Sequence, residues 1–179
     1  MKNAPIPLNV TLDNVNHNPV VQMQQKTATV GQTIPVDKIA KALGLASDDL
    51  KIDNLVPTVV QTEVAHTMVP IKNLQLLNDC APDNKQLIEI SKQYKFEGFY
   101  CFTFTDQNQE YVVESRFFNP LIGIDEDAAT GTAAGPLRTH TRLQSGDCPN
   151  RWFFLESYGD NEWSGPIDGA SRSDPVRKD

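Results

Sequence analysis

Short apolar stretches with two different spacings divide this chain into strand-like and helix-like segments. Strand-like patterns cover residues 7–12, 20–24, 58–64, 66–71, 99–105 and 111–118. The first two segments alternate apolar and polar positions around an Asn- and Pro-rich break, and the last two flank a polar turn. Each of these two pairs therefore predicts a β-hairpin.

Helical spacing occurs in residues 36–45, 73–80 and 83–94. In the first of these, apolar residues fall on one helical face, and Gly44 is a plausible stop because glycine often ends a helix. Asp83 is suited to cap the start of the last helix, since its carboxylate can accept hydrogen bonds from free backbone N–H groups. Hairpins that alternate with separate helices predict an α+β fold.

Composition and charge predict one globular domain that does not bind nucleic acid. A chain of 179 residues, 39% of them hydrophobic, can bury the core of one domain, and we expect residues 1–163 to form it. Residues 164–179 are rich in Ser, Gly, Pro and charge, which predicts a poorly ordered tail. A net charge of −7 without clusters of Lys and Arg argues against nucleic acid as a partner.

Apolar runs and cysteine spacing indicate a cytoplasmic protein. No apolar run approaches the length of about 20 residues that spans a bilayer, and Met1 is not followed by the apolar segment of a secretory signal. We therefore expect no membrane association. The cysteines, Cys80, Cys101 and Cys148, are widely separated and lack metal-site spacing, so we expect no metal site. Cys101 lies in an apolar run and is interpreted as a packed strand residue.

Candidate chemistry is concentrated in residues 123–135, which read Gly-Ile-Asp-Glu-Asp-Ala-Ala-Thr-Gly-Thr-Ala-Ala-Gly. Two carboxylates, Glu126 and Asp127, directly precede a small-residue turn that opens into a helical pattern. The first N–H groups of a helix have no internal partner and can hold an anion, and small residues let the anion come close. Asp127 would then stand beside these amides, where it can accept or give a proton.

A family resemblance rests on the same residues. The run from Glu126 to Gly135, preceded by Arg116-Phe-Phe-Asn-Pro120 and by Gly123, resembles the motif of the PhzF-type phenazine-biosynthesis and epimerase-like proteins. That motif reads Arg-x-Phe-x-Pro, a spacer, and then Glu-Asp-Pro-x-Thr-Gly-Ser-Ala. Upstream segments follow in the family's order and approximate spacing, so the resemblance covers roughly residues 7–143.

The chain departs from the family pattern at several positions. Ala128 replaces the usual proline and Thr132 the usual serine, which keeps a small turn residue and a hydroxyl. Pro136 fits a helix only within its first turn, because proline lacks the N–H and clashes with the preceding turn. After Leu143 the resemblance fades.

The resemblance implies an isomerase that moves a proton on a small carboxylated substrate without a cofactor. It implies that Asp127 is catalytic and that the substrate is held by Arg116, Gly131, Thr132 and Ala133. The implied fold is one lobe of the diaminopimelate-epimerase type, a curved mixed β-sheet wrapped around a helix from Thr132 to about Arg142.

Half of the implied active site is expected to be missing. Proteins of this family have two lobes, and their proton-transferring glutamate and a Gly-His-Pro histidine come from the first lobe, which has no counterpart in this sequence. The expected partners are therefore a small carboxylated molecule and either a second copy of the chain or a first-lobe partner. The alternative is a non-catalytic binding or interaction module.

Simpler interpretations stay open for the individual residues. Asp127 can be a solvated acid at a helix start, Thr132 can cap that helix, and Glu126 is more readily explained as structural. Arg116 can pair with a nearby glutamate instead of the substrate. His66 is interpreted as a packed strand histidine, since no acid lies near it in the sequence.

Overall fold

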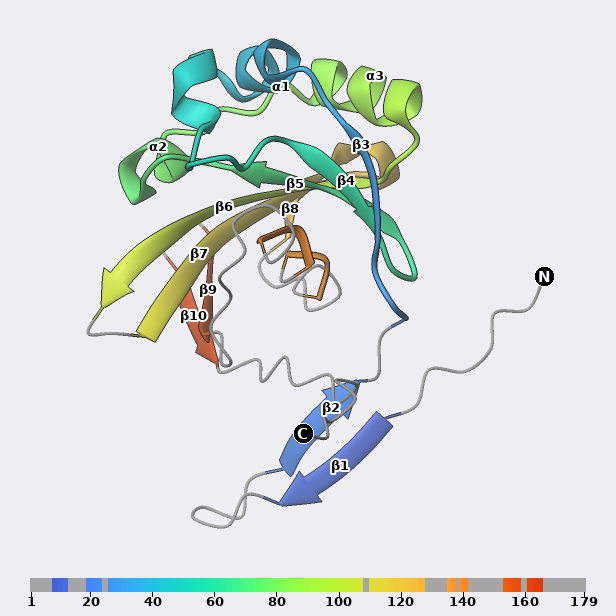
Figure 1. Cartoon of the computed structure of the whole chain (residues 1–179), viewed down its shortest axis with the longest axis vertical. Helices are drawn as coiled ribbons and strands as arrows, with labels where there is room; N and C mark the ends of the chain where they lie inside the picture. The colour runs from blue at the N-terminus through green and yellow to red at the C-terminus, as the bar shows by residue number, and fades with distance from the viewer. Residues whose placement is uncertain are drawn as a thin grey trace, which may run out of the picture.

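A computed structural model gives the arrangement of the chain and describes residues 8–12, 19–23, 26–107, 110–127, 135–137, 139–141, 153–158 and 161–165 (Figure 1). The strands are β1 (Leu8–Leu12), β2 (Pro19–Met23), β3 (Thr29–Thr33), β4 (Thr58–Gln61), β5 (Ala65–Pro70), β6 (Gly98–Gln107), β7 (Glu110–Asn119), β8 (Ile124–Asp127), β9 (Phe153–Tyr158) and β10 (Asn161–Gly165). The helices are α1 (Val36–Leu43), α2 (Leu74–Asn78), α3 (Asn84–Tyr94) and the 3₁₀ turns η1 (Ser47–Leu50) and η2 (Pro120–Ile122). Residues 135–137 and 139–141 are also helical.

In the described part of the chain, β3 to β10 form one eight-stranded sheet in the order β10-β9-β7-β6-β5-β4-β3, with β8 paired to β7 beside this path. The sheet is mixed, because β5 runs parallel to β6 and β9 runs parallel to β7, while the other neighbours are antiparallel. Strands and separate helices thus combine as expected, and the α+β prediction is confirmed.

The predicted helices are confirmed with shorter bounds, and the hairpin predicted for residues 99–105 and 111–118 is confirmed with longer strands, β6 and β7. Gly44 ends α1 in the left-handed conformation with φ of 72°, which only glycine adopts readily. The Asp83 carboxylate accepts hydrogen bonds from the backbone N–H groups of Lys85 and Gln86 at the start of α3. Among the described residues, none of the helices has the length and apolar character needed to cross a membrane.

Helices cover both faces of the sheet. One apolar cluster includes Leu43 of α1, Leu87 of α3 and the strand residue Phe99, all fully buried. A second cluster includes Tyr100 and Leu137, and Leu137 comes from the helical residues 135–137. Since consecutive residues of β6 point to opposite faces, the two clusters lie on opposite sides of the sheet. Figure 1 shows α1 and α3 on one side and the helical residues near 140 on the other.

The first hairpin stands apart from this body. β1 and β2 pair with each other in antiparallel register, from Leu8 opposite Met23 to Leu12 opposite Pro19, and form a separate two-stranded sheet. The hairpin predicted for residues 7–12 and 20–24 is therefore confirmed. In Figure 1 it lies below the large sheet and is joined to it through β3.

Some elements have no counterpart among the predictions. β3, β8, β9 and β10 are strands that the apolar pattern did not indicate. β10 ends at Gly165, so the segment predicted as a tail contributes its first two residues to the sheet. The rest of that tail lies outside the described residues.

Candidate functional site

Asp127 is the last residue of β8, and its position is set by an irregular pairing of β8 with β7. Asp127 lies opposite Phe117, and Ile124 lies opposite Asn119, with a register shift between the two pairs. Two residues of β8, Asp125 and Glu126, therefore share the space opposite the single residue Phe118, which is the arrangement of a β-bulge.

The bulge separates the three consecutive acids. Glu126 contacts Arg116 on the face that α2 and α3 cover, and Asp125 accepts a 2.7 Å hydrogen bond from Asn84 Nδ2 at the start of α3. Asp127 shares the opposite face with Phe117, because directly paired residues of neighbouring strands point to the same side. That is the face on which Leu137 packs. Asp127 is half-buried there.

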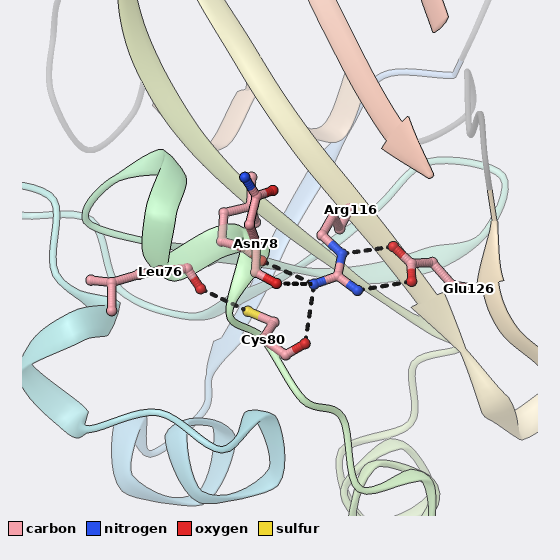
Figure 2. Close-up of polar contacts among 6 residues, drawn as sticks. Leu76, Asn78, Cys80, Arg116 and Glu126 are labelled. Carbon is pink, nitrogen blue, oxygen red and sulfur yellow. Dashed lines mark hydrogen bonds and ion pairs between the residues drawn. The ribbon is translucent and has the colours of Figure 1, made fainter. Parts of the chain in front are cut away.

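Arg116 lies at the centre of a polar cluster on the α2 side of the sheet, which Figure 2 shows. Its guanidinium donates to both carboxylate oxygens of Glu126, at 2.7 Å from Nε and 2.9 Å from Nη2. Nη1 donates to the backbone carbonyls of Leu77, Asn78 and Cys80, at 3.0 to 3.2 Å. The Arg116 guanidinium carbon also lies 5.0 Å from the centre of the Phe118 ring.

The contacts of Arg116 in this cluster are structural, because they connect β7 to β8 and to the end of α2. A cation is favourable at the C-terminal end of a helix, and Arg116 donates to carbonyls at the end of α2 and just beyond it. The hydrogen bonds that Arg116 donates to the Glu126 carboxylate raise the pKa of Arg116 above its ordinary value. The pairing with Glu126 that the sequence left open is thus observed. Binding of substrate by Arg116 stays a prediction, and Arg116 lies on the face opposite to Asp127.

The helix that follows the motif is buried on the side of Asp127. Leu137 and His140 are fully buried, and His140 Nε2 lies 3.0 Å from the backbone oxygen of Val56. Burial lowers the pKa of His140 from its ordinary value, and the hydrogen bond to Val56 opposes this effect. Gly131, Thr132 and Ala133 lie outside the described residues, so the predicted amide site remains a prediction.

His66 of β5 is a buried histidine on the same face, as the sequence indicated. It is 4% exposed, and its ring meets the Phe117 ring edge to face at 5.2 Å. Burial lowers its pKa to about 4. Phe117 in turn lies over Gly98, where an added Cβ would come within 2.2 Å of Phe117 Cζ. His66 thus contacts Phe117, the residue that lies opposite Asp127 on the neighbouring strand. The sequence could not predict this contact, because it depends on which strands become neighbours in the sheet.

The described cysteines are not placed for nucleophilic chemistry. Burial raises the pKa of the Cys80 thiol to about 11, and it raises that of the fully buried Cys101 well above its ordinary value. Cys101 is a packed strand residue, as interpreted from the sequence. Among the described residues, no group of three or more His, Cys, Asp or Glu has the arrangement of a metal site.

A comparison with protein-family models identifies the family. Residues 5–160 match the model described as phenazine biosynthesis-like protein. The chain belongs to the PhzC-PhzF family. Within this family it is similar to an uncharacterized isomerase of Clostridium acetobutylicum, with 33% identity over 135 residues, which are 74% of this chain and 44% of the relative.

Other PhzC-PhzF proteins agree with this assignment. A trans-2,3-dihydro-3-hydroxyanthranilate isomerase of Pseudomonas fluorescens is 29% identical over 103 residues, which are 58% of this chain and 32% of that enzyme. The crystal structure of a PhzF-family protein from Bacillus anthracis matches the fold with a TM-score of 0.69 at 20% identity, and covers 84% of this chain and 51% of that chain. The chain thus spans about half the length of these relatives or less.

Proposed function

We propose that this chain supplies the substrate-holding half of a PhzF-type isomerase that transfers a proton on a small carboxylated molecule without a cofactor. The observation that carries this proposal is the position of Asp127 at the end of β8, directly before the small residues of the family motif in the sequence. β8 pairs with β7, and Leu137 of the helical residues 135–137 packs on the same face as Asp127.

The chemistry follows from this placement. In the proposed site the free amides of Gly131, Thr132 and Ala133 hold the carboxylate of the substrate, as the first N–H groups of a helix commonly hold anions. Asp127 lies beside the bound molecule and contacts the reacting region. A proton transfer needs an acid or base within about 3 Å of the transferred proton, and a group from a complementing lobe supplies it.

The fold supports the same proposal. The mixed sheet has the helical residues 135–137 packed on one face and α1 and α3 on the other, and we propose that this is one lobe of the diaminopimelate-epimerase type. The curated relatives are isomerases, and the part they share with this chain is 44% of one relative and 32% of the other. The same length difference favours a second candidate, a non-catalytic carboxylate-binding module.

Exchange of carbon-bound protons with deuterium tests the proposal. The purified chain is incubated in deuterated buffer with a dihydroanthranilate and with amino acids, and incorporation of deuterium is followed by mass spectrometry. We expect no exchange by the chain alone, and exchange when a complementing lobe is present that Asp127→Asn abolishes. Exchange by the chain alone that is lost in Asp127→Asn would make Asp127 the base and would refute the half-site. Carboxylate binding without exchange in the assembled complex would support the binding module.

A further inference from the structure

Asn119, the last residue of β7, buries a hydrogen-bond acceptor that the described part of the chain leaves without a partner. The residue is 3% exposed, and its Oδ1 accepts no hydrogen bond there. Burying a polar atom without a hydrogen bond costs free energy, because the atom loses its contacts with water and gains none in return. Nearly all buried polar atoms in folded proteins are paired, so this one calls for an explanation.

The Asn119 side chain lies on the face of the sheet that contains Asp127. Side chains alternate along β7, so Asn119 shares a face with Phe117 and not with Phe118. In β8, Asp127 lies opposite Phe117, and Ile124 lies opposite Asn119. Asn119 is therefore diagonal to Asp127, and residues in that relation lie about 7 to 8 Å apart. A small molecule beside Asp127 can reach both side chains.

The neighbours of Asn119 on β8 border solvent. Ile124, directly opposite Asn119, is 38% exposed. A Cβ added to Gly123 would meet no atom within 4 Å. Asp127 is half-buried. The unpaired acceptor is thus buried at the end of a strand, next to residues that a small molecule can approach.

A second polar atom without a partner lies at the same end of this face. His66 lies opposite Gly98 at the start of β6. Phe99 lies opposite Phe118, so Gly98, one position earlier, continues this register to Asn119. His66 and Asn119 therefore flank a glycine that contributes no side chain. Within the described residues, the buried Nδ1 of His66 also has no hydrogen-bond partner.

Thr103 of β6 shows that a missing partner alone does not mark a binding site. Its hydroxyl is also buried and has no partner among the described residues. Thr103 shares a face with Cys101, which packs in the cluster on the side of α1 and α3. It is therefore on the side of the sheet away from Asp127. What distinguishes Asn119 is its position beside Asp127, and Thr103 provides a matched control.

We propose that Asn119 determines substrate specificity, with its Oδ1 accepting a hydrogen bond from a hydroxyl or amino group of the carboxylated substrate. A carboxamide oxygen accepts hydrogen bonds and cannot donate them, so the group that it binds must carry an O–H or N–H. A buried acceptor also discriminates against an analogue without this group, because the acceptor then stays unpaired. This inference rests on the proposed function, because Asp127 marks the place where the substrate is proposed to bind.

Binding of matched carboxylate probes tests the inference. Benzoate, the monohydroxybenzoates and the monoaminobenzoates differ in one donor group, and each is titrated into the full chain and followed by NMR. Wild-type chain is compared with Asn119→Leu, which keeps a similar shape without polar atoms. Asn119→Ala makes the same test without added bulk if Asn119→Leu does not fold. Thr103→Val, which removes the unpaired hydroxyl on the other face, is the control.

We expect at least one hydroxy or amino probe to bind the wild-type chain about tenfold more tightly than benzoate. The hydroxy and amino series show which donor Asn119 prefers. Asn119→Leu should abolish the preference and Thr103→Val should keep it. Both variants should melt at the wild-type temperature or above it, because each removes an unpaired polar atom from a buried position.

Equal affinity of all probes for the wild-type chain overturns the inference and leaves the proposed carboxylate site intact. A preference that persists in Asn119→Leu or Asn119→Ala, or one that Thr103→Val abolishes as well, also overturns it. If none of the probes binds the wild-type chain, the inference fails together with the proposed function.

Discussion

Arg116 and Glu126 join β7 to β8 through two parallel hydrogen bonds, 2.7 Å from Nε to Oε1 and 2.9 Å from Nη2 to Oε2. Their side chains are only 15% and 19% exposed. The same guanidinium holds the carbonyls at the end of α2, so one side chain connects three elements. The residue next to Glu126 is Asp127, and the pair therefore fixes the strand that carries the candidate catalytic acid.

Replacing Arg116 by Met should lower the free energy of unfolding by about 3 kcal/mol, because Glu126 and three carbonyls lose a charged donor in a largely buried setting. Urea unfolding followed by circular dichroism measures the change. Arg116→Lys keeps the charge but cannot form both hydrogen bonds to the carboxylate, so its loss should be intermediate. A loss below about 0.5 kcal/mol for Arg116→Met would show that the cluster does not stabilise the fold.

Two adjacent carboxylates should respond differently to neutralisation. Glu126→Gln should cost about 1 to 2 kcal/mol, because one of its two hydrogen bonds with Arg116 is lost. Asp127→Asn should change the free energy of unfolding by less than about 0.5 kcal/mol, as expected of a residue kept for function. Both variants are compared by urea unfolding at pH 7. A loss for Asp127→Asn that equals or exceeds that for Glu126→Gln favours a structural role for Asp127.

His66 should make the protein less stable in weak acid. Its pKa falls from 6.5 to about 4 on folding, so the unfolded chain binds a proton between these pH values and the folded chain does not. The contribution of neutral His66 is complete above pH 6.5 and decreases as the pH falls toward 4. Between pH 7.5 and pH 5 we expect a loss of about 2 kcal/mol from this group.

The comparison of wild-type chain with His66→Gln isolates this effect, because glutamine does not titrate and the acidic residues are common to both proteins. Urea unfolding is measured at pH 7.5, 6 and 5. The wild-type curve should fall more steeply than that of the variant. Parallel curves for the two proteins would mean that His66 is accessible to protons in the folded state.

Adding one methyl group at Gly98 should displace Phe117, which contacts His66 and lies opposite Asp127. The Cβ of Gly98→Ala would lie 2.2 Å from Cζ of Phe117, so the ring has to move, at a cost of about 1 to 3 kcal/mol. Phe117→Leu removes the clashing ring. In the Phe117→Leu background, Gly98→Ala should therefore cost less stability than it costs in the wild-type chain. Thermal melting checks both comparisons, and a simple addition of the two losses would contradict the clash.

Sequence patterns predicted the parts of the fold that depend on local periodicity. α1 and α3 have apolar faces with clear caps at Gly44 and Asp83, and β6 and β7 are long and rich in aromatic residues. β8 was missed because three of its four residues are acidic, a composition that disfavours strands. It forms because β7 provides a neighbour and Arg116 neutralises Glu126.

The candidate site was predictable only in part. The family motif indicated Asp127, which the structure describes as the last residue of β8, and its catalytic role stays a prediction. Which face Arg116 occupies could not be predicted, since this depends on the register of β7 against β8 and on one bulge. The contacts of Arg116 with α2 join residues more than 35 positions apart, a separation at which local patterns carry no information.

The bulge in β8 also determines how much negative charge surrounds a bound anion. In a regular strand Asp125 and Asp127 would point to the same side, and a carboxylated molecule would meet two like charges there. The extra residue turns Asp125 toward Asn84 and leaves Asp127 as the acid that β8 directs to the other side. A single inserted residue thus removes one of two repulsive charges from the place where the substrate is proposed to bind.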